Sequence, residues 1–76
     1  MDFPQYRKLS NDRSFYRINS NDSFDELQIM GDRVFLHRIQ AEKYPEKLRI
    51  MDMLDCVVGY QNSTSEEWEM LEKRLQ

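Results

Sequence analysis

The chain has 76 residues, 39% of them hydrophobic and 33% charged, with a formal net charge of −3. A chain of this length forms one domain, residues 1–76, and buries only about 60% of its unfolded surface, which excludes a second domain and a large multi-step active site. The acidic balance argues against general nucleic-acid binding, because a negatively charged chain repels phosphate backbones.

The N-terminal residues, the apolar runs and the cysteine content indicate the cellular location of the protein. The N-terminal residues lack the basic-then-apolar layout of a signal peptide, and no apolar run approaches the ~20 residues of a membrane helix. Cys56 is the only cysteine, so an intramolecular disulfide and a cysteine-built zinc site are excluded. We expect a cytoplasmic protein with no membrane contact.

The first two predicted elements are strands over residues 5–10 and 14–19. They flank Asn11 and Asp12, which tolerate the left-handed backbone of a tight turn. A two-residue loop places Lys8 opposite Phe15 on the neighbouring strand. A three-residue loop would shift every pair and turn one strand over, and the sequence leaves both registers open.

A second hairpin is predicted from residues 24–30 and 34–41, joined at Gly31 and Asp32. Glycine at the first position of a two-residue loop favours a type II′ turn. This register makes one face almost entirely apolar, with Leu27 opposite Leu36, and gives charge pairs of opposite sign. The competing interpretation is a short helical turn over residues 23–26, which have the capping-box pattern.

The second half of the chain changes to helical periodicity. A helix is predicted to begin at Tyr44-Pro45 and to end near Asp55 or Cys56. Leu48, Met51 and Leu54 are expected to face the core, with Ile50 widening this stripe and Met53 lying off it. Residues 57–61 are predicted as a strand that a right-handed crossover could place parallel to a neighbour. Thr64 and Glu67 form the capping box of a last helix, which buries Trp68, Leu71 and Leu75.

The order of these elements, β-β-β-β-α-β-α, indicates an α+β fold. We predict two layers: a four- to five-stranded sheet, antiparallel or mixed, with both helices on the face formed by Leu27, Ile29, Val34 and Leu36. The opposite face is then free.

Residues able to support catalysis are sparse. His37, the only histidine, is predicted to face Glu26, and Cys56 has an acidic neighbour that disfavours its thiolate. No metal-ligand spacing and no glycine-rich phosphate loop is visible, so we expect no cofactor and no enzymatic activity.

Two groups of residues are candidates for a contact face. The free sheet face mixes rings with polar side chains, as interfaces do, and the first hairpin interleaves aromatic and basic residues, as in modules that bind single strands. We therefore predict a non-catalytic module that binds a protein partner or a second copy of itself; the alternative is single-stranded nucleic-acid binding. The candidate residues are Glu26, Gln28, Arg33, Phe35 and His37 in the first group and Tyr6, Lys8, Phe15 and Arg17 in the second.

Overall fold

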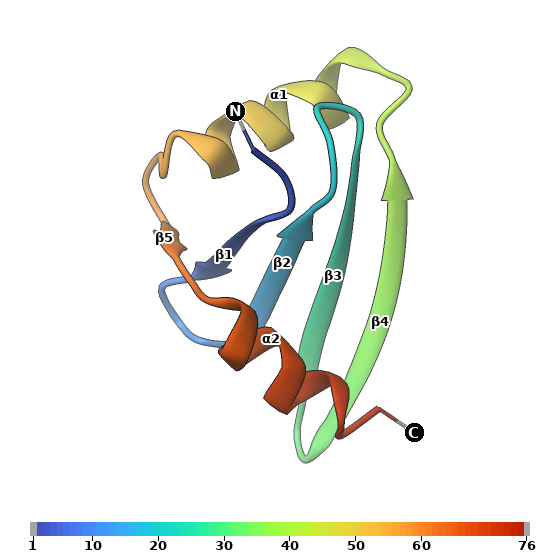
Figure 1. Ribbon diagram of the computed structural model, residues 1–76, viewed down its shortest axis with the longest axis vertical. Helices are drawn as coiled ribbons and strands as arrows, with labels where there is room; N and C mark the ends of the chain where they lie inside the picture. Colours follow the sequence, from blue (N-terminus) through green and yellow to red (C-terminus); the bar gives the residue numbers. More distant parts are fainter. Residues whose placement is uncertain (1, 76) are drawn as a thin grey trace.

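The computed structural model describes residues 2–75 (Figure 1). The elements follow the predicted order of an α+β domain, β-β-β-β-α-β-α. In chain order they are β1 (Gln5–Leu9), β2 (Ser14–Ile18), β3 (Ser23–Met30), β4 (Arg33–Gln40), α1 (Tyr44–Leu54), β5 (Tyr60–Asn62) and α2 (Ser65–Glu72). The strands form one sheet in the order β4-β3-β2-β1-β5, and every neighbouring pair is antiparallel.

The first hairpin adopts the register of the two-residue loop. Lys8 lies opposite Phe15, and Asp12 takes the left-handed conformation, with φ of 57°. The Asp12 N–H donates to the Leu9 carbonyl at 2.9 Å, and the Asn11 side chain accepts from the Arg13 N–H at the same distance. Local turn chemistry therefore decides between the two registers that the sequence left open.

The second hairpin has the predicted register along its whole length. Leu27 lies opposite Leu36 and Glu26 opposite His37, and Gly31 has φ of 64° at the first turn position. The helical turn considered for residues 23–26 is wrong, because these residues belong to β3 and pair with strands on both sides. Two ladders of backbone hydrogen bonds outweigh one capping box.

The two helices lie on opposite faces of the sheet, so the prediction that they share one face is wrong. α1 packs on Tyr16, Ile18 and Phe24, whereas α2 packs on Phe15 and Leu27. Successive residues of a strand point to opposite faces, which separates these two sets. Figure 1 shows α1 across one end of the sheet and α2 near the other. The result is helix, sheet and helix, each helix covering one end of its own face.

We refer to these two packed groups as the α1 cluster and the α2 cluster. The buried members of the α1 cluster are Tyr16, Ile18, Phe24, Ala41, Ile50 and Met53. Those of the α2 cluster are Phe15, Leu27, Val34, Trp68 and Leu71. The α1 cluster was not predicted from the sequence, because its face of the second hairpin also contains Glu26 and Gln28. These polar residues lie on the same face of β3 as Phe24 and make that face look solvent-exposed.

The first helix is rotated relative to the prediction. Ile50 is buried, as its place in the predicted stripe required, but Met53, predicted to lie off the stripe, is fully buried as well. Leu48 and Met51, which were expected to face the core, are 39% and 57% exposed. The strand predicted from residue 57 begins only at Tyr60; Val58 is 97% exposed, and β5 runs antiparallel to β1 rather than parallel to a neighbour. Across residues 2–75, no helix has the length and apolarity that a membrane crossing requires.

The last helix agrees with its sequence pattern. The Thr64 side chain accepts a hydrogen bond from the Glu67 N–H at 3.1 Å, which closes the amino end of α2. Trp68 and Leu71 are buried, and Leu75 contacts the α2 cluster after the helix has ended.

Candidate interaction surfaces

The candidate contact residues divide between the two faces of the sheet. Tyr6, Lys8, Phe15 and Arg17 share one face, as the two-residue loop requires, but α2 lies over them. Phe15 is only 7% exposed, and the Arg17 guanidinium lies 4.9 Å from the centre of the Trp68 ring. The Tyr6 and Phe15 rings therefore pack against α2 and do not form an open platform on which bases could stack.

Arg17 is held on a second side by a carboxylate. Its Nη2 lies 2.8 Å from Oδ2 of Asp25, which also accepts from the Asn19 amide at 3.2 Å. Asp25 is nearly buried, so its charge is balanced within the fold. Arg38 lies opposite Asp25 in the ladder but does not bond to that carboxylate.

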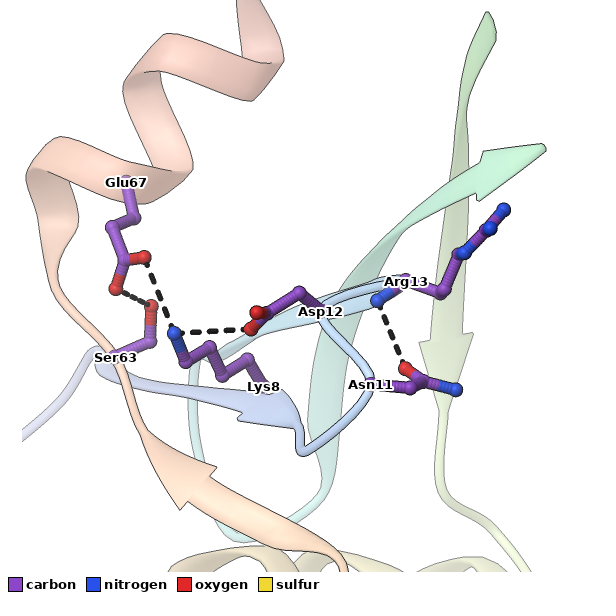
Figure 2. Close-up of polar contacts among 6 residues, drawn as sticks. All are labelled: Lys8, Asn11, Asp12, Arg13, Ser63 and Glu67. Atoms are coloured by element: carbon purple, nitrogen blue, oxygen red, sulfur yellow. Dashed lines mark hydrogen bonds and ion pairs between the residues drawn. The ribbon is translucent and has the colours of Figure 1, made fainter. Parts of the chain in front are cut away.

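Lys8 forms a charged network that fastens α2 to the first hairpin (Figure 2). Its Nζ lies 3.1 Å from the Asp12 carboxylate and 3.5 Å from that of Glu67, which also accepts from the Ser63 hydroxyl at 2.8 Å. The hydrogen bond that Lys8 donates to the Asp12 carboxylate raises the pKa of Lys8 above its ordinary value, against the opposing effect of desolvation. Lys8, Asp12 and Glu67 all have partners within the network, which is consistent with a structural role.

A hollow of about 250 Å³ lies beside this network, under α2. Its lining combines apolar side chains from both sheet and helix with three charged side chains. No local sequence pattern could indicate this hollow, because its walls come from the first turn, from β2 and β3, and from α2. The lining residues are Asp12, Phe15, Ile29, Glu67, Met70, Leu71 and Arg74.

The second group of candidate residues lies on the face that α1 partly covers. Glu26 lies next to Arg49, whereas Arg33, Phe35 and His37 remain exposed. The histidine Nε2 is 3.1 Å from the Gln28 side-chain oxygen. His37 and Glu26 are opposite in the ladder, but the nearest cation to the Glu26 carboxylate is Arg49, at 4.0 Å.

Arg49 is a contact residue inside the fold that sequence reasoning missed. Its guanidinium lies over the rings of Tyr16 and Phe24, at 5.4 and 5.2 Å, and donates to the Tyr16 hydroxyl at 3.2 Å. Burial, and then the negative charge of Glu26, raise the pKa of the Tyr16 phenol, against the opposing effect of Arg49. An arginine in this position covers the α1 cluster with its stem and satisfies a buried hydroxyl with its head.

Cys56, the only cysteine, lies next to a side-chain amide. The Cys56 thiol lies 3.6 Å from the Asn62 side-chain oxygen, and its backbone has φ of 52° after the end of α1. Among residues 2–75, no cluster of three or more His, Cys, Asp and Glu side chains could hold a metal ion.

The outer surface of α1 carries exposed apolar side chains. Tyr44, Leu48 and Met51 are 74%, 39% and 57% exposed. Their spacing of four and three residues places them on one side of the helix, opposite the buried Ile50 and Met53. We call these three residues the outer stripe.

Comparison with models of known families, with curated proteins and with solved structures found no match. The functional argument therefore rests on these surfaces.

Proposed function

We propose that the protein is a non-catalytic interaction module that associates with a second copy of itself through the outer stripe of α1. The observation that carries the proposal is an apolar stripe on each side of one short helix, of which the fold uses only one. Large exposed apolar residues that gather on one element are typical of an interface, whereas scattered ones are ordinary surface.

The charges along α1 favour a second copy in antiparallel orientation. Lys43 and Lys47 lie at the amino half of the helix, and Asp52 and Asp55 lie at its carboxyl half. An antiparallel pair brings each basic half against an acidic half, and the opposed helix dipoles add to this attraction. A twofold axis repeats each contact, so one self-complementary patch serves both copies.

The same arrangement gives the apolar residues partners. With the axis midway between Leu48 and Met51, the leucine of one copy lies opposite the methionine of the other. Tyr44 then lies opposite Asp55, whose carboxylate can accept from the phenol hydroxyl. No group on the outer stripe is left as an unpaired buried charge, which is the usual penalty of such an interface.

The length of α1 limits the strength of the dimer. Eleven residues of helix extend about 16 Å. A pair of such helices buries less than the ~1,200 Å² of a standard stable interface, so we expect a reversible dimer. Its dissociation constant should lie in the range of about 10–100 µM.

Sedimentation velocity between about 5 and 500 µM tests the proposal. The wild-type coefficient should rise with concentration, whereas the Leu48→Glu/Met51→Glu double variant should stay monomeric with an unchanged circular dichroism spectrum. Val58→Glu is the matched control, because Val58 is 97% exposed and lies outside the outer stripe; it should associate like the wild type. A wild-type protein that is monomeric at every concentration, or a control that abolishes association, would refute the proposal.

A further inference from the structure

β4 is an edge strand whose outer side is open along most of its length. It pairs with β3 alone among the named strands. The Ile29 N–H donates to the Arg13 carbonyl in the first hairpin at 2.8 Å. In an antiparallel ladder the backbone groups of successive residues point to alternate sides, so those of Gln28 point towards β4 and those of its partner Phe35 point back towards β3. The N–H and C=O groups of Leu36, Arg38 and Gln40 consequently point away from the sheet.

One end of this edge already contacts the backbone of a residue outside the named strands. Leu75 forms an isolated parallel bridge with Val34, close to the Gly31 turn. The outer backbone groups at Val34 can therefore pair with a chain segment that lies beside β4. Residues 36–40 continue the same edge without a partner among the residues that the structure describes.

The charge of β4 is opposite to that of the whole chain. The strand contains Arg33, His37 and Arg38 and no carboxylate, in a chain with net charge −3. Neither arginine forms an ion pair with any of residues 2–75. Arg38 faces Asp25, which is paired with Arg17, and Arg33 faces the uncharged Met30. The rings and cations of β4 are exposed, with Phe35 40% accessible.

We infer that the open edge of β4 binds an extended acidic segment of another protein as an added strand. The outward backbone groups of residues 36–40 supply the ladder, and Arg33 and Arg38 select for carboxylates. Arg33 and Phe35 lie on one face of the sheet and Arg38 on the other, so carboxylates on both faces of the added strand find a cation. This binding does not depend on the α1 dimer.

An NMR titration tests the inference. The probe is a seven-residue peptide of alternating Glu and Val with blocked ends, added to the ¹⁵N-labelled Leu48→Glu/Met51→Glu variant, so that dimerisation does not interfere. We expect the largest amide shifts at Leu36, Arg38 and Gln40, slower amide exchange there, and an affinity that falls as salt rises. Arg33→Glu/Arg38→Glu should weaken binding at least about tenfold.

Three controls make the result decisive. The same peptide with Lys in place of Glu should not bind, and a peptide with Pro at its centre should bind more weakly because it lacks a ladder N–H. Arg13→Glu, at an exposed arginine of the other hairpin, should bind like its parent variant. Equal binding of the lysine peptide, shifts centred away from β4, or no shift at all would overturn the inference; the last is the result for an edge whose charges only deter strand pairing.

Discussion

Arg7 closes the carboxyl end of α1 from another element of the fold. It belongs to β1, yet its Nε donates to the Met53 carbonyl at 2.9 Å and its Nη2 to the Leu54 carbonyl at 3.2 Å. α1 has no basic residue in its own last turn. Arg7 therefore supplies both the missing hydrogen-bond donors and the positive charge that the carboxyl end of a helix favours.

Replacing Arg7 should destabilise the fold. Arg7→Met keeps much of the apolar stem but leaves the Met53 carbonyl without its donor, and we expect a loss of about 2–3 kcal/mol in the free energy of unfolding. Urea denaturation followed by circular dichroism measures it. Arg13→Met is the matched control, because Arg13 is exposed and its side chain points away from the Lys8 network in Figure 2; its effect should stay within about 0.5 kcal/mol. Equal losses in the two variants would show that the cap is energetically unimportant.

The arginines mark the limit of sequence reasoning at the scale of single residues. Arg7, Arg17 and Arg49 would be assigned to solvent by hydropathy, yet each contacts a buried carbonyl or ring. Arg7 lies 46 residues from its main acceptor. No local sequence pattern predicts such a contact. The helix cap formed by Thr64 and Glu67, in contrast, is predicted directly, because these residues are only three positions apart.

At the scale of elements, local chemistry predicted the hairpins and failed for the rotation of α1. Gly31 fixes the loop length of the second hairpin, and loop length fixes the register. α1 instead offers two apolar sides at helical spacing, one with Leu48 and Met51 and one with Ile50 and Met53. The choice between them depends on which side completes the α1 cluster, and this is a tertiary contact that periodicity does not contain.

The rotation of α1 predicts unequal effects of two similar truncations. Ile50→Ala should lower the free energy of unfolding by about 2–4 kcal/mol, because it leaves a cavity in the α1 cluster. Leu48→Ala should change it by less than about 0.5 kcal/mol when measured at concentrations where the protein is monomeric. Urea denaturation of both variants decides the matter. A larger effect at Leu48 would mean that the outer stripe is the core-facing side.

At the scale of the whole molecule, the sheet is the middle layer of three. The α1 and α2 clusters lie on its opposite faces and at its opposite ends, so neither helix contacts the cluster of the other. β2 and β3 contribute residues to both clusters. Tyr16 and Phe24 face α1, whereas Phe15 and Leu27 face α2. The sequence predicted both helices on one face because the second hairpin has a single clearly apolar face. The α1 cluster instead combines sheet residues that are distant in sequence, such as Ile18 of β2, Phe24 of β3 and Ala41 after β4.

Shared strands should make the two clusters unfold together. Trp68 is the only tryptophan and is buried in the α2 cluster, so its fluorescence reports on the face opposite α1. Ile50→Ala, in the α1 cluster, should lower the thermal midpoint seen by Trp68 fluorescence by about 10 °C and move the circular dichroism midpoint equally. A mutation on one face can shift a reporter on the other only if β2 and β3 transmit the loss as one cooperative unit. A Trp68 transition that stays at its wild-type midpoint while circular dichroism falls earlier would instead mean that each helix and its end of the sheet unfold separately.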